Sequence, residues 1–99
     1  LHSARIAELS GLVAAGRARA VQAERSVSEA QSILAARRSN LDAAERELTM
    51  LRPLAEREIV SRLDLIKAEN AVTVARNESN LGLVVLDARK AELSVAATI

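Results

Sequence analysis

Apolar residues recur every 3.5 positions along the first half of the chain. One heptad frame holds without a slip from Ile6 to Leu51. Its two sets of core positions are Ile6, Val13, Ala20, Val27, Leu34, Leu41, Leu48 and Leu9, Gly16, Ala23, Ala30, Arg37, Ala44, Leu51. Such a repeat specifies a seam between two helices. We therefore predict a helix over residues 16–52, and residues 1–15 form a helical overhang that continues it at the base.

Two glycines interrupt the apolar pattern near the start of this helix. Gly11 and Gly16 each cost about 1 kcal/mol relative to Ala in a helix interior. A break near residues 11–16 stays open for that reason. Because the heptad frame runs through the stretch, we favour a continuous helix.

Pro53 is the strongest helix breaker in the sequence. Proline lacks a backbone donor, its ring clashes with the preceding helical turn, and it disfavours helical angles at Arg52. We expect the first helix to end at Arg52 and a turn to occupy residues 53–60.

The second helix has a start signal at Ser61. Ser61 and Asp64 are spaced as a capping box, in which the serine accepts a hydrogen bond from the amide of Asp64. Val60, just outside the helix, is placed to pack on Leu65 as a hydrophobic staple. These signals predict a second helix over residues 61–98.

The second helix carries two apolar stripes, and only one of them can pack on the first helix. One stripe contains polar interruptions and comprises Val60, Leu63, Lys67, Asn70, Val74, Asn77, Leu81, Val84, Ala88, Ala91, Val95 and Thr98. The other comprises Leu65, Ala68, Val72, Ala75, Gly82, Leu86, Leu93 and Ala96. We predict that the second stripe packs laterally on neighbouring chains, through Leu65, Val72, Leu86 and Leu93.

Two helices of similar length joined by about eight residues predict the fold class. The chain is expected to be all-α, a long antiparallel two-helix coiled-coil hairpin. Such a hairpin is too thin for a globular core of its own. We therefore expect one hairpin domain that is a fragment of a larger protein, because the sequence also opens on Leu1 rather than Met.

Composition argues against several classes of function. The chain has 14 Lys and Arg against 13 Asp and Glu, with no aromatic residue and no Cys. Without a basic patch or stacking side chains, a nucleic-acid partner is disfavoured. His2 is the only imidazole, and Glu45 and Glu47 face different sides of a helix. We expect a non-enzyme with no cofactor and no metal site.

The stretch from Leu51 to Leu65 resembles the hairpin tip of periplasmic adaptor, or membrane fusion, proteins, nearest to the hemolysin-D-like adaptors of type I secretion systems. The matching residues are Leu54, Ile59, Val60, Ser61 and Arg62. Residues 4–8, Ala-Arg-Ile-Ala-Glu, also resemble the family's stretch before its hairpin. The sequence departs from the family at Met50, where relatives often carry Arg, and at Glu58, where they often carry Gly; the second departure predicts a differently shaped turn.

The resemblance implies a mechanical function in protein export. Such adaptors are anchored in the inner membrane, lie in the periplasm and assemble as homo-oligomers, commonly hexamers. They bridge an inner-membrane ABC transporter to a TolC-type outer-membrane channel, which their hairpin tips contact. Carried over to this sequence, the residues at the contact are Leu54, Arg57, Ile59, Val60, Ser61, Arg62 and Leu63.

Other functions remain open on the sequence alone. The heptads by themselves fit a generic coiled-coil oligomerisation or scaffold module, and the tip fits the adaptor of a drug efflux pump as well as one of a secretion system. A helix lying on a membrane surface is disfavoured because no Lys- and Arg-rich face opposes bulky apolar anchors.

Overall fold

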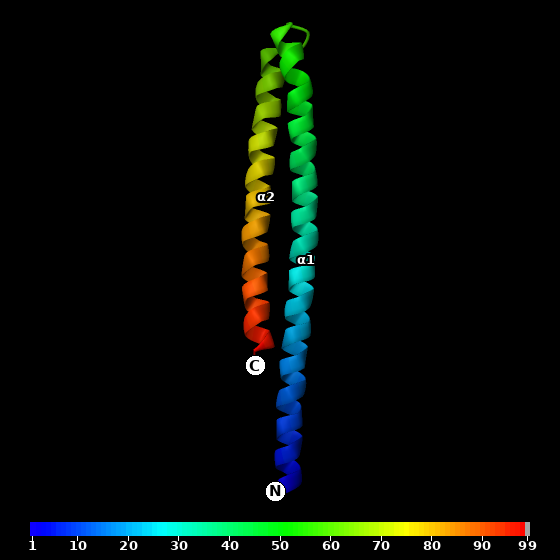
Figure 1. Ribbon diagram of the computed structural model, residues 1–99, viewed down its shortest axis with the longest axis vertical. Helices are drawn as coiled ribbons and strands as arrows, with labels where there is room; N and C mark the ends of the chain where they lie inside the picture. The colour runs from blue at the N-terminus through cyan, green and yellow to red at the C-terminus, as the bar shows by residue number, and fades with distance from the viewer. Residues whose placement is uncertain (99) are drawn as a thin grey trace. The chain divides into compact units, whose positions relative to one another are not determined.

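The computed structural model describes residues 1–98, which form two long helices without a strand. Helix α1 spans His2–Glu56 and helix α2 spans Arg62–Ala97 (Figure 1). The helices divide into two compact units. The tip unit is Ser32–Val84, and the base unit joins Leu1–Gln31 to the part of α2 that begins at Val85. In each unit the two helical segments run antiparallel, so the predicted all-α hairpin is confirmed.

The seam predicted on α1 is confirmed from Gly16 to Leu51. Every core position of the heptad frame in this stretch is buried or half-buried. In the tip unit, Leu48, Ala68 and Val72 form the centre of an apolar cluster, and the partly buried side chains around it are Leu41, Ala44, Leu51 and Leu65. In the base unit the buried apolar residues are Val27, Ala30 and Leu86.

Two ion pairs join the helices within the tip unit. Arg37, the only charged residue in the α1 seam frame, reaches Glu78 with 2.9 Å between its guanidinium nitrogen and a carboxylate oxygen. Arg76 and Glu45 lie 3.5 Å apart. All four side chains are partly exposed to solvent, so each pair is worth at most about 1 kcal/mol. Their role is to favour one register of the two helices.

The two helices of the tip unit lie close together at Gly82. A Cβ atom placed on Gly82 would lie 3.3 Å from Cδ1 of Leu34 and 3.6 Å from its Cα. Most real Cβ contacts are longer, so a larger residue at position 82 would push Leu34 aside. The absence of a side chain at this position lets α2 pack directly on the α1 backbone.

The prediction that Leu65, Val72, Leu86 and Leu93 pack on neighbouring chains is wrong. Val72 is 5% exposed and Leu86 is 6% exposed, while Leu65 and Leu93 are half-buried. These side chains lie in the seam of the hairpin. The stripe that faces solvent is the other one, with Val74, Leu81, Val84 and Val95 exposed. Small residues explain why this stripe of α2 is the one that is buried. It also contains Ala68, Ala75, Ser79 and Gly82, which permit close contact between the helices.

The predicted end of the first helix is also wrong, because α1 continues through Pro53 to Glu56. A proline removes only one hydrogen bond from the helical ladder, and the following turn is restored by the amide of Arg57, which donates to the Pro53 carbonyl at 3.2 Å. Leu54 and Ala55 in this last turn are half-buried. Helix α1 is also unbroken at residues 11–16, as the heptad frame predicts.

Neither helix within residues 1–98 combines the length and the apolar character that a membrane crossing demands.

Candidate functional site

The last turn of α1 closes with a Schellman motif. The amide of Glu58 donates to the carbonyl of Ala55 at 3.0 Å, and the amide of Ile59 donates to the carbonyl of Leu54 at 2.8 Å. These are the two hydrogen bonds that define the motif, with Glu58 at the position that follows the C-cap. They satisfy two carbonyl groups that would otherwise lack partners at the helix end.

Glu58 has a left-handed backbone conformation, with φ of 59°. Glycine is the usual residue at this position of a Schellman motif because it has no Cβ. An L-residue there costs roughly 1–2 kcal/mol. Glu58 therefore has the backbone conformation that glycine usually adopts at this position, and its Cβ strains the backbone.

The start of α2 is the capping arrangement that the sequence predicts. The amide of Asp64 donates to Oγ of Ser61 at 3.1 Å, and the amide of Leu65 donates to the Ser61 carbonyl at 3.3 Å. Asp64 lies in the first turn, where its negative charge is favourable with the helix dipole. The N-cap at Ser61 is confirmed. Val60 and Leu65, the predicted staple, are both half-buried.

The seven tip residues named from the sequence lie together at the turn and the two adjoining helix ends. Ile59 is 60% exposed and Leu63 is 59% exposed, although both are large and apolar. The exposed polar members are Arg57, Ser61 and Arg62, and the half-buried members are Leu54 and Val60. The tip therefore presents two aliphatic side chains to solvent among polar groups.

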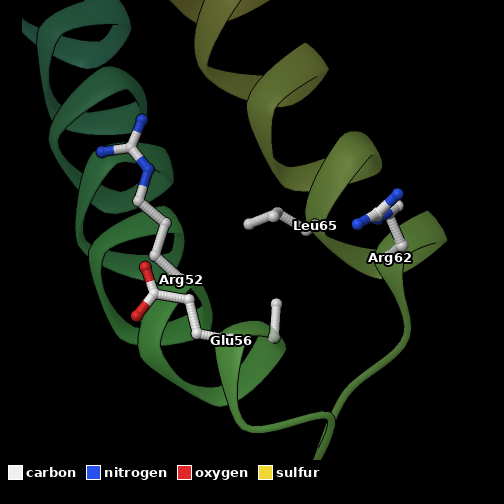
Figure 2. Close-up of a pocket in the computed structure, with 5 residues that line it drawn as sticks. Arg52, Glu56, Arg62 and Leu65 are labelled. Atoms are coloured by element: carbon white, nitrogen blue, oxygen red, sulfur yellow. The ribbon is translucent and has the colours of Figure 1, made fainter.

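An open cleft of about 300 Å³ lies beside this surface, between the end of α1 and the start of α2. Its lining residues are Arg52, Ala55, Glu56, Arg62 and Leu65. Figure 2 shows Leu65 directed from α2 toward α1, with Arg52 and Glu56 on the opposite wall. Its lining combines the aliphatic Ala55 and Leu65 with the charged Arg52, Glu56 and Arg62.

Sequence reasoning missed three residues of this cleft, Arg52, Ala55 and Glu56. It placed Ala55 and Glu56 in an irregular turn because Pro53 predicted an earlier helix end. The pair of hydrogen bonds that closes the helix after Glu56 depends on the left-handed conformation of Glu58, which a glutamate does not by itself indicate.

The site holds no group of three or more metal-binding side chains, within the part of the chain that the structure describes. Comparison of the chain with family models, with curated proteins and with solved structures gives no match.

Proposed function

We propose that this chain is the helical hairpin of a hemolysin-D-like periplasmic adaptor that serves type I protein secretion. In this proposal the parent protein is anchored in the inner membrane and forms a homo-oligomer, commonly a hexamer. It connects an ABC transporter to a TolC-type outer-membrane channel, and the hairpin tip contacts the channel. The hairpin itself has a mechanical role, without catalysis, cofactor or nucleic acid.

The observation that carries the proposal is the exposure of the tip residues that resemble the family. Ile59 and Leu63 leave most of their side chains in solvent, and burial of such side chains is favourable by about 25 cal/mol per Å². Arg57, Ser61 and Arg62 surround them and supply groups that fix orientation in a contact. Exposed aliphatic residues at a narrow tip are best explained by a protein partner that covers them.

The decisive experiment places a charge at the centre of the tip surface. Ile59→Asp in the parent protein would put an unpaired carboxylate into the channel contact, where an uncompensated buried charge costs several kcal/mol. Export measured in cells should be abolished. Ile59 lies in the turn between the helices, so the purified hairpin should keep its helical circular dichroism signal.

Ile33→Asp is the matched control, because Ile33 is a large aliphatic residue that is 45% exposed and lies far along α1 from the turn. This variant should export like the wild type. Normal export by Ile59→Asp would remove Ile59 from the contact and with it the main support for the adaptor. If both variants abolish export, a general effect of surface charge replaces the tip contact as the explanation.

A further inference from the structure

The last turn of α1 contains two backbone features that oppose its helical structure. Pro53 lies inside the helix without an amide proton, so it cannot donate a hydrogen bond to the carbonyl of Thr49, and its ring crowds the preceding turn. Glu58 holds the left-handed conformation that is unfavourable for most residues other than glycine. We call residues 53–58 the closing turn. Each end of this segment is therefore a residue that is poorly suited to the backbone around it.

Few tertiary contacts hold the closing turn in place. Leu54 and Ala55 are half-buried, and its other four residues are exposed. None of the six belongs to the apolar cluster of the tip unit. The hydrogen bonds that complete the turn come from the amides of Arg57, Glu58 and Ile59, which are all exposed residues. Segments with few buried contacts and solvent-exposed backbone hydrogen bonds open at a lower free energy than the core of the same protein.

The start of α2, at the same tip, lacks these opposing features. The hydroxyl of Ser61 caps the helix, and Asp64 places a negative charge in the first turn, where the helix dipole favours it. Residues 61–65 contain neither a proline nor a residue with positive φ. The two helix ends that form the tip therefore differ in local stability.

We propose that the closing turn is a conformational switch that opens independently of the rest of the hairpin. In the closed state α1 extends to Glu56. In the open state α1 ends near Arg52, where the proline by itself would end it, and the three hydrogen bonds from residues 57–59 are broken. Opening releases the left-handed conformation of Glu58, while the N-cap at Ser61 stays intact.

The switch changes the surface that the tip presents. Ala55 and Glu56 line the cleft between the helix ends, so opening dismantles one wall of it (Figure 2). Opening also uncovers the half-buried Leu54 close to the exposed Ile59. A partner that fills the cleft binds only the closed state and shifts the tip toward it. The switch itself is a property of this chain and does not depend on the proposed contact with a channel.

Amide hydrogen exchange of the chain, followed residue by residue by NMR, tests the switch. The protection factor of an amide, the ratio of its intrinsic to its observed exchange rate, measures how seldom its hydrogen bond opens. The amide of Ile59 should be at least tenfold less protected than that of Val72, which is buried in the seam. Low concentrations of urea should leave the protection of Ile59 unchanged and lower that of Val72, because only a local opening exposes little surface.

Three substitutions separate the causes of opening. Pro53→Ala restores the missing donor and should raise the protection of the Ile59 amide at least tenfold. Glu58→Gly removes the strain and should raise it about fourfold. Ser61→Ala is the matched control at the other helix end. It should lower the protection of the Leu65 amide and leave that of Ile59 unchanged.

Three results would overturn the proposal. If urea lowers the protection of Ile59 as steeply as that of Val72, the closing turn opens only when the whole hairpin unfolds. Unchanged protection of Ile59 in Pro53→Ala would show that the proline does not set the opening. Equal loss of protection at Ile59 and Leu65 in Ser61→Ala would show that the two helix ends open as one unit.

Discussion

Glu58→Gly tests the strain at the tip most directly. Glu58 is the one residue other than glycine with a positive φ among residues 1–98. Its left-handed conformation is held by the two hydrogen bonds that close α1, from the amides of Glu58 and Ile59. A glycine at position 58 would keep both bonds and remove the contact between Cβ and the backbone.

The expected change in the free energy of unfolding follows from two opposing contributions. Relief of the left-handed conformation contributes roughly 1–2 kcal/mol. The greater freedom of glycine in the unfolded chain offsets about 0.4–1 kcal/mol of this. These ranges leave a net stabilisation of about 0–1.6 kcal/mol, with about 0.8 kcal/mol at their midpoints. For a domain of this size, the midpoint value corresponds to a rise in melting temperature of about 3–6 °C.

The assay is urea unfolding followed by circular dichroism, at a fixed protein concentration. The midpoint should rise while the slope m stays unchanged, since the substitution does not alter the surface exposed on unfolding. A thermal melt under the same conditions gives the second measure of stability.

Two further variants separate the backbone from the side chain. Glu58→Ala keeps Cβ but removes a negative charge near the C-terminus of α1, where such a charge is unfavourable by about 0.3–1 kcal/mol. The Glu58→Gly variant should be more stable than the Glu58→Ala variant by the net backbone effect given above, because both variants lack the negative charge. Glu56→Gly, inside the last helical turn, should instead destabilise by about 1 kcal/mol.

Equal stability of the two position-58 variants would refute the reasoning, because charge alone would then explain any gain. A loss of stability in Glu58→Gly would show that the unfolded-state entropy of glycine outweighs the strain at the tip.

Three other substitutions test the packing by urea unfolding. Ser61→Ala should lower stability by about 1 kcal/mol through loss of the N-cap, and an unchanged midpoint would mean that the hydroxyl contributes nothing. Val72→Ala should cost about 1–2 kcal/mol and Val74→Ala at most about 0.5 kcal/mol, because only Val72 is buried; the reverse order would contradict the seam. Gly82→Val should destabilise by about 1–3 kcal/mol by forcing Leu34 aside, and an increase in stability would show that the helices can separate there without cost.

The sequence by itself determines the helices and the face that α1 buries. Only one heptad stripe runs along α1, so burial of its apolar residues admits one orientation of the helix. Local chemistry also sets the start of α2, because the hydroxyl of Ser61 and the amide of Asp64 are three residues apart and need no distant partner.

Only the tertiary structure decides which face of α2 enters the seam. Both stripes of α2 have the heptad period, so periodicity alone does not separate them, although only one of them contains polar interruptions. The choice depends on how side chains fit across the two helices: Gly82 permits the approach of Leu34, and Arg37 finds Glu78. Such a fit involves residues that are distant in the chain, so the periodicity of either helix does not reveal it.

The end of α1 shows the same division between local signals and tertiary packing. Pro53 is a local signal against helix, yet α1 continues through it to a hydrogen-bonded closure at Glu58, with Leu54 half-buried in the last turn. The sequence alone therefore identifies the residues of the tip but misplaces the helix end beside them. The hydrogen bonds that close the helix end and the half-buried Leu54 and Ala55 stabilise the last turn, and together they offset the lost hydrogen bond and the ring clash of the proline.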